Sequence, residues 1–154
     1  MSGWSDTDIA NMRVALEEAR LAGVDSEVPV GAVLVLHDKV IARSGNRTVA
    51  DHDPSAHAEV VVLRNGGKQI GNHRLNDATL YVTLEPCTMC VGAIVQARVR
   101  RVVFGAYDRR AGALGSALDL TDEKALNHNF EISGGVMADE CSALLTEFFE
   151  ARRS

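Results

Sequence analysis

Between Ala78 and Gly105, two apolar stretches rich in β-branched residues flank one stretch with helical periodicity. This pattern predicts a strand over Ala78–Thr83, a helix over Cys87–Ala97 and a second strand over Val99–Gly105. Two strands joined through a helix lie parallel in one sheet, because a crossover rather than a tight hairpin connects them. Such a unit requires helices to cover the sheet, and it therefore predicts an α/β fold.

The flanking sequence supplies further elements for such a sheet. The apolar run Val28–Leu36 predicts a buried strand, and a turn joins it to a second strand over Val40–Ser44. A fifth strand is expected over Glu131–Val136. The first of the flanking helices is predicted over Asp8–Leu21 and the last over Ala138–Arg152. Between them, a helix is predicted to open at Asp53-Pro54, run to about Asn65 and stop at Gly66-Gly67. We therefore expect a mixed sheet covered by helices.

Length and charge narrow the class of protein. The chain has 154 residues, a size typical of one domain, and we expect a single domain over residues 1–154. Its formal net charge of −5 argues mildly against a general binder of polyanions such as nucleic acid. We find neither the pattern of a signal peptide nor an apolar run long enough to cross a membrane. We therefore expect a cytoplasmic protein with reduced cysteines and no membrane partner.

Two short segments at the starts of predicted helices carry the candidate chemistry. The first pairs His57 with Glu59, and the second is Cys87-x-x-Cys90, preceded by a proline. One imidazole and two thiolates are ligands that zinc favours, and three protein ligands leave the fourth tetrahedral position to water. An open position is typical of catalytic zinc. Glu59 is then the candidate carrier of protons between that water and a leaving amine.

Helix geometry places a condition on this hypothesis. Residues two apart on an ideal helix point in nearly opposite directions. His57 and Glu59 therefore share a pocket only if it lies off the helix end, or if the first turn is irregular. The start of a helix also favours a thiolate at Cys87, since free backbone N–H groups and the helix dipole lower the pKa of its thiol.

Each residue taken alone has a less specific interpretation. A Cys-x-x-Cys segment is also found as a redox pair or as two core cysteines, although the small Gly-Pro-type spacer of many redox pairs is absent here. A lone histidine in an apolar stretch is usually a core residue, and Glu59 alone is usually a solvated helix charge. Their joint occurrence in this order favours catalytic zinc. Cys141 falls on an apolar helix stripe and is predicted to lie in the core.

The two segments match the signature shared by zinc-dependent nucleobase deaminases. Over nearly its whole length the chain also resembles the bacterial tRNA-specific adenosine deaminases. The segments that carry the resemblance are Glu27–Val33, His52–Glu59, Ala78–Cys90, Gly105–Asp108, Gly112–Ser116 and Ala138–Cys141. The resemblance implies a cytidine-deaminase-like, three-layer α/β/α sandwich around a five-stranded mixed sheet, and a homodimer. It implies hydrolysis of the wobble adenosine, position 34, in the anticodon loop of an arginine tRNA to inosine, with release of ammonia.

The same resemblance assigns roles by position. His57, Cys87 and Cys90 hold one zinc ion per subunit, and Glu59 carries protons. Asn46 hydrogen-bonds the flipped nucleoside, and Asp108 contacts the backbone of the anticodon loop. From the residues alone, Asn46 is better explained as a turn residue and Asp108 as a solvated loop carboxylate.

A local excess of arginine offsets the acidic total charge. The cluster consists of Arg98, Arg100, Arg101, Arg109 and Arg110. If the loop after the strand Val99–Gly105 lines the active site, these side chains face tRNA phosphates, with Arg109 and Arg110 as the first candidates. The alternative is an ordinary solvated face with ion pairs.

Two other functions stay open on the sequence. One is a deaminase of free guanine, cytosine or a nucleoside that uses the same zinc chemistry. The other is a non-catalytic zinc or RNA-binding module, which Glu59 disfavours because a structural zinc ion needs no proton carrier.

Overall fold

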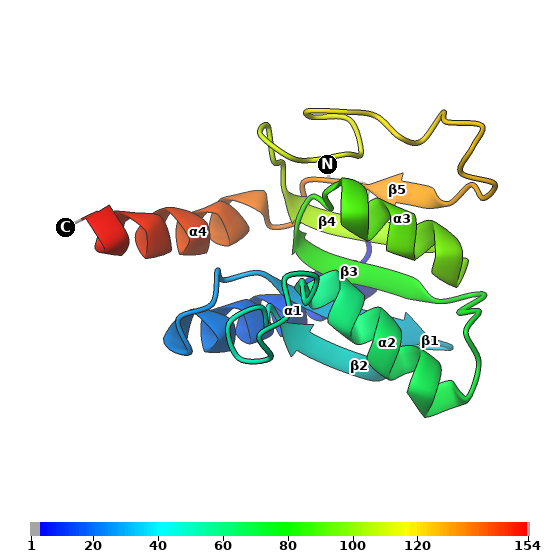
Figure 1. Cartoon of the computed structure of the whole chain (residues 1–154), viewed down its shortest axis with the longest axis horizontal. Coiled ribbons are helices and arrows are strands. Elements are labelled where there is room, and N and C mark those ends of the chain that lie inside the picture. The colour runs from blue at the N-terminus through cyan, green and yellow to red at the C-terminus, as the bar shows by residue number, and fades with distance from the viewer. Residues whose placement is uncertain (1–3, 154) are drawn as a thin grey trace.

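The structure is a computed structural model that describes residues 4–153. Its sheet forms one layer between helices (Figure 1). The elements in chain order are α1 (Asp6–Val24), β1 (Gly31–Leu36), β2 (Lys39–Gly45), α2 (Ala58–Ile70), β3 (Thr79–Leu84), α3 (Thr88–Ala97), β4 (Arg101–Ala106), β5 (Glu131–Ser133) and α4 (Ala138–Arg153).

The five strands form one mixed sheet in the order β2-β1-β3-β4-β5. β1 pairs antiparallel with β2 and with β3, whereas β3, β4 and β5 run parallel. The crossover from β3 through α3 to β4 is the unit predicted from the alternation of strand and helix. The predicted α/β class and the five-stranded mixed sheet are confirmed.

Alternate residues of the strands feed two cores, one on each face of the sheet. On β3, Leu80 and Val82 join the core beneath α2 and α3, while Tyr81 points into the core beneath α1 and α4. Cys141 of α4 is 1% exposed in that second core, as predicted. Two helices therefore cover each face, and the result is the three-layer sandwich.

A buried ion pair ties α1 to the sheet. Arg101 donates from Nη1 to Asp8 Oδ1 at 2.8 Å and from Nη2 to Asp8 Oδ2 at 3.0 Å, and the Tyr81 hydroxyl donates to Asp8 Oδ1 at 2.9 Å. Burial alone would raise the pKa of the Asp8 carboxyl, but these hydrogen bonds outweigh it and hold the pKa below its usual value. This network therefore fastens the α1 face, opposite α2 and α3.

The start of α2 differs from the prediction. The helix was expected to open at Asp53-Pro54, yet its first residue is Ala58. The Asp53 carboxylate instead accepts hydrogen bonds from the backbone N and the hydroxyl of Ser55, at 2.8 and 2.7 Å. That local turn uses the oxygen that would have capped a helix, so the segment stays irregular up to His57.

The end of α2 differs as well. Gly66-Gly67, predicted to stop the helix, lies inside it. The helix ends at Ile70 and is followed by its C-cap, Gly71, whose φ of 69° is left-handed. A Cβ atom at Gly66 would lie 2.4 Å from Leu34 Cδ2. The glycine therefore serves close packing of α2 on β1 rather than termination.

Two strand boundaries lie three residues from their predicted positions, the start of β1 and the end of β5. β1 begins at Gly31 rather than Val28, because Pro29 has no N–H to donate to a neighbouring strand. β5 ends at Ser133, where the chain turns through Gly134 and Gly135 before α4. Within residues 4–153, no helix has both the length and the apolar character required to cross a membrane.

Candidate active site

Three side chains from two helix starts converge at one end of the sheet. His57 Nδ1 lies 3.7 Å from Cys87 Sγ and 3.5 Å from Cys90 Sγ, and all three ligand atoms lie within 4.8 Å of one another. Atoms that share one tetrahedral zinc ion at its usual bond lengths are about 3.5 to 3.8 Å apart. The donor set and its spacing therefore fit zinc, as predicted.

The N-termini of α2 and α3 provide this geometry. His57 and Cys87 are the N-cap residues of the two helices, with extended backbone, and neither side chain caps its own helix. Both side chains are therefore free to point off the helix end. Cys90 is the third residue of α3, and the side chain at that position reaches back toward the N-cap. This places the second thiol beside the first.

Glu59 completes the cluster. Glu59 is 4% exposed, and its carboxyl group is hydrogen-bonded to the side chain of Cys90 and interacts electrostatically with His57. Because His57 precedes the helix, the opposite directions expected for two residues of a regular helix do not apply. His57 and Glu59 therefore share a pocket beyond the N-terminal end of α2, as the helix geometry required. Burial raises the pKa of the Glu59 carboxyl, which brings it closer to the range of a group that exchanges protons near neutral pH.

The two thiols differ in acidity. Two hydrogen bonds, the stronger influence coming from Cys90 and the weaker from His57, lower the pKa of the Cys87 thiol to about 3. The hydrogen bond between the two cysteines raises the pKa of the Cys90 thiol. The hydrogen bond between His57 and Cys87 raises the pKa of the His57 imidazole. The thiolate that the helix start was predicted to favour is therefore at Cys87. Zinc binding displaces the remaining protons from the ligands.

Asn46 supplies the cap that His57 does not. Its Oδ1 accepts a hydrogen bond from the backbone N of Ala58 at 2.7 Å, so the end of β2 is fastened to the first turn of α2. This bond fixes the orientation of the amide and leaves Nδ2 as its donor group.

Asp108, Arg109 and Arg110 lie in the segment after β4, which we call the 107–118 loop. Asp108 Oδ1 accepts hydrogen bonds from the backbone N of Arg110 at 3.0 Å and of Ala111 at 3.2 Å. The two arginines are exposed on this turn. Gly112, further along the loop, forms a β-bridge with Cys87, so the loop borders the zinc ligands.

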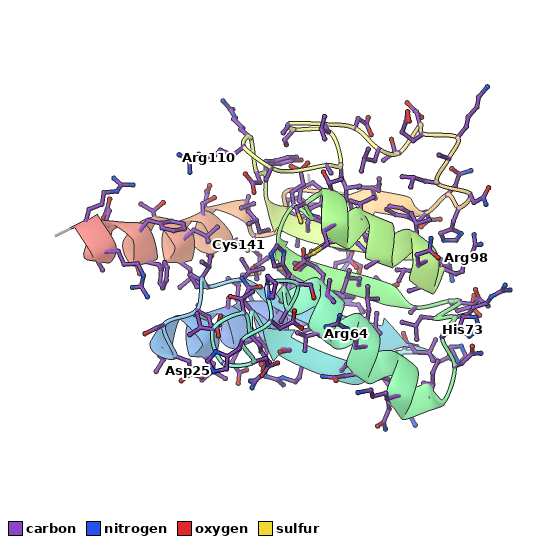
Figure 2. The ribbon with its side chains drawn as sticks, in the orientation of Figure 1. Asp25, Arg64, His73, Arg98, Arg110 and Cys141 are labelled. Atoms are coloured by element: carbon purple, nitrogen blue, oxygen red, sulfur yellow. The ribbon has the colours of Figure 1, made fainter. Side chains whose placement is uncertain are left out.

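The other three arginines of the predicted cluster lie elsewhere. Arg98 follows the last residue of α3, and Arg100 and Arg101 stand at the start of β4, whereas the zinc ligands and the 107–118 loop are at the opposite end of both elements. Figure 2 shows Arg98 at the far end of α3, well away from Arg110. Strand β4 therefore separates these three arginines from Arg109 and Arg110, and Arg101 is paired with Asp8.

Two buried carboxylates near the site were not singled out from the sequence. Glu27 accepts hydrogen bonds from Thr48 Oγ1 and from the backbone N of Val49 and Ala50, and so holds the loop after β2. Glu85 accepts hydrogen bonds from the 107–118 loop. The available signal was their position, because each is an acidic residue directly beside an apolar run.

The fold and the ligand set, with a buried carboxylate beside it, define a zinc-dependent deaminase. When bound at such a site, zinc lowers the pKa of a coordinated water toward neutrality and so supplies a nucleophile. The family model of the cytidine and deoxycytidylate deaminase zinc-binding region matches residues 5–106. The chain belongs to this family.

Individual relatives show which kinds of deaminase this chain is similar to. The chain is 50% identical over 150 residues to the tRNA-specific adenosine deaminase of Haemophilus influenzae, covering 97% of this chain and 87% of that protein. A structure from studies of A-to-I editing by tRNA:A34 deaminases is similar with a TM-score of 0.87 and 47% identity, over 88% of this chain and 99% of that one. The guanine deaminase of Nitrosomonas europaea is similar with a TM-score of 0.78 and 25% identity, over 91% and 83%. These similarities to enzymes disfavour a non-catalytic module.

The ligand assignment predicts the zinc content of variants. The purified chain should carry about one zinc ion, and Cys87→Ala and Cys90→Ala should each lose most of it, because two ligands hold zinc much less tightly than three. Elemental analysis after gel filtration measures this. Cys141→Ala is the matched control, since it removes a buried thiol outside the site and should keep its zinc. Full occupancy in both ligand variants would refute the assignment.

Proposed function

We propose that this protein hydrolyses the wobble adenosine, position 34, of an arginine tRNA to inosine and ammonia. The observation that carries the proposal is the cluster of His57, Cys87 and Cys90 beside buried Glu59, in a chain half identical to a tRNA-specific adenosine deaminase. In this reaction water adds at C6 of the adenine base, and the amino group leaves as ammonia.

Glu59 carries the protons of this reaction. Its carboxylate takes a proton from the attacking water and delivers it to the ring nitrogen, then takes the proton of the new hydroxyl group and delivers it to the departing amine. Its burial supports this role, because a carboxyl group with a raised pKa both accepts and returns a proton readily. Water is limited around a side chain that is 4% exposed, so the proton passes between enzyme and substrate.

Asn46 and Asp108 contact the substrate. With Oδ1 engaged by Ala58, the Asn46 amide donates from Nδ2 to the flipped nucleoside. Asp108 contacts the backbone of the anticodon loop while its Oδ1 holds the turn that presents Arg109 and Arg110. An unpaired loop suits such a site, since a loop base is turned outward at a cost of only about a few kcal/mol.

The protein acts as a homodimer in the cytoplasm. Support for the dimer comes from the family resemblance and from an open, largely apolar groove between α2 and α3. The groove is lined by residues that include Val60, Leu63, Gly67, Ala93 and Ala97. A reducing compartment keeps Cys87 and Cys90 available as zinc ligands.

The proposed reaction is tested with a transcribed arginine tRNA beside a panel of free adenine, guanine, cytosine and adenosine. Inosine and ammonia should form from the tRNA, with little reaction on the panel. Glu59→Gln should keep its zinc and lose at least ~100-fold in rate, because the amide no longer accepts the proton. Glu140→Gln, an exposed change on α4, is the control. A preference for a free base would replace the tRNA proposal with the broader deaminase function.

The two loop arginines should control tRNA binding. Replacing Arg109 and Arg110 together by Ala should raise KM for the tRNA about tenfold at low salt and flatten the salt dependence, since about 0.7 of a counterion is released per phosphate contact on single strands. Arg74→Ala with Arg100→Ala, two exposed arginines at the other end of the sheet, should leave KM within twofold. Normal editing by the Arg109 and Arg110 variant at every salt concentration contradicts this role.

Dimer formation is checked by sedimentation at micromolar concentration. Ala93→Arg should shift the protein toward the monomer, because the new charge lies in the groove between α2 and α3. Thr146→Arg adds the same charge to an exposed position of α4 and should leave the dimer intact. A fully active monomer of the unaltered chain would reject the assembly.

A further inference from the structure

We propose that Glu85 is a positioning residue, whose buried carboxylate holds the RNA-binding 107–118 loop in place relative to the zinc ligands. The inference rests on the proposed function, because it gives the loop a part in binding RNA. Glu85 itself contacts neither the substrate nor the metal in this scheme.

Both oxygens of Glu85 are used by one segment of chain. Oε1 accepts hydrogen bonds from the backbone N of Asp108 at 3.1 Å and from the Ser116 hydroxyl. Oε2 accepts from the backbone N of Leu114 at 3.0 Å and of Ser116 at 3.1 Å. Glu85 is 2% exposed, and within residues 4–153 it forms no ion pair. Hydrogen bonds from the loop therefore compensate the burial of this carboxylate.

The backbone around Glu85 ties the same loop to the zinc segment. The Glu85 N–H donates to the carbonyl of Ala106 at 2.8 Å, and the Pro86 carbonyl accepts from the backbone N of Ala113 at 2.8 Å. Glu85 thus stands two residues before Cys87, on a stretch of chain whose own position is fixed. The side chain of Glu85 and the backbone of Glu85 and Pro86 therefore both form hydrogen bonds that fix the start and the middle of the 107–118 loop.

Gly112 makes the contact between loop and carboxylate unusually close. A Cβ atom at this position would lie 2.4 Å from Glu85 Cδ and 2.5 Å from the carbonyl oxygen of Asp108. Any larger residue would push the loop off the carboxylate.

The consequence for RNA binding follows from where the hydrogen bonds fall. Asp108 donates its N–H to Glu85, and its own carboxylate then shapes the turn at Arg109 and Arg110. Without the Glu85 carboxylate the loop becomes mobile, and RNA binding must then order it at an entropic cost. The cost appears in KM rather than kcat, because Glu59 and the zinc ligands keep their places.

Glu85→Gln tests the proposal, because an amide has one acceptor oxygen and turns an NH₂ group toward donors that need an acceptor. KM for an arginine tRNA anticodon stem-loop should rise about tenfold, with kcat within threefold and about one zinc ion per chain. Hydrogen exchange of the amides between residues 108 and 116, followed by mass spectrometry, should become faster.

Asp8→Asn is the matched control. It also replaces a buried, hydrogen-bonded carboxylate by an amide, but on the α1 face, so it should lower thermal stability while leaving KM and exchange in the 107–118 loop unchanged. Ser116→Ala keeps the Glu85 charge and removes one donor, and it should raise KM about two- to threefold. This milder variant provides the test if Glu85→Gln does not fold.

Three results would overturn the inference: an unchanged KM in Glu85→Gln, or in Ser116→Ala if that variant alone folds; an equal rise of KM in Asp8→Asn; or loss of zinc from Glu85→Gln. If the unaltered chain edits no tRNA, the proposed function fails separately. Loop exchange in Glu85→Gln then still decides whether this carboxylate positions the loop.

Discussion

The site depends on the packing of α2 and α3 side by side on one face of the sheet, where α2 lies over β1 and β2 (Figure 1). Zinc accepts ligand atoms only at close spacing, and here one imidazole comes from the start of α2 and two thiols from the start of α3. The right-handed crossover from β3 to β4 places the start of α3 at the carboxyl ends of these strands. The apolar core beneath both helices then holds their N-termini together, so burial of apolar surface sets the ligand distances.

Around this centre, backbone N–H groups are satisfied by side chains from neighbouring segments. Asn46 caps α2 because the His57 side chain is turned toward Cys87 and Cys90. Glu27 accepts hydrogen bonds from the loop after β2, and Glu85 accepts them from the 107–118 loop. Each of these groups is buried or half-buried, and losing such an acceptor leaves buried donors without a partner, at a cost of about 1–3 kcal/mol each. Asn46, Glu27 and Glu85 therefore fix the shape of the loops near the site, although none of them is a zinc ligand.

The charge distribution reconciles an acidic protein with a polyanionic substrate. The formal net charge is −5, yet Arg109 and Arg110 stand exposed beside the zinc ligands, and Arg101 is neutralised by Asp8 on the α1 face. Phosphate contacts act over short distances at physiological salt, so the local charge of the 107–118 loop matters more than the total. The net negative charge of the chain disfavours nonspecific binding of polyanions.

Residue type and local periodicity encode the identity of the zinc ligands, their position at helix starts and the parallel strand pair in a mixed sheet, so these features were predictable from the sequence. It misplaced the start of α2, since Asp53-Pro54 satisfies the local rules of a helix opening while the actual capping oxygen comes from Asn46 at the end of β2. The ion pair of Arg101 with Asp8 and the contact of Glu85 with the 107–118 loop are visible only in the folded structure. Such pairings depend on which element ends pack together, and that is set by the summed burial of the whole core rather than by any local pattern.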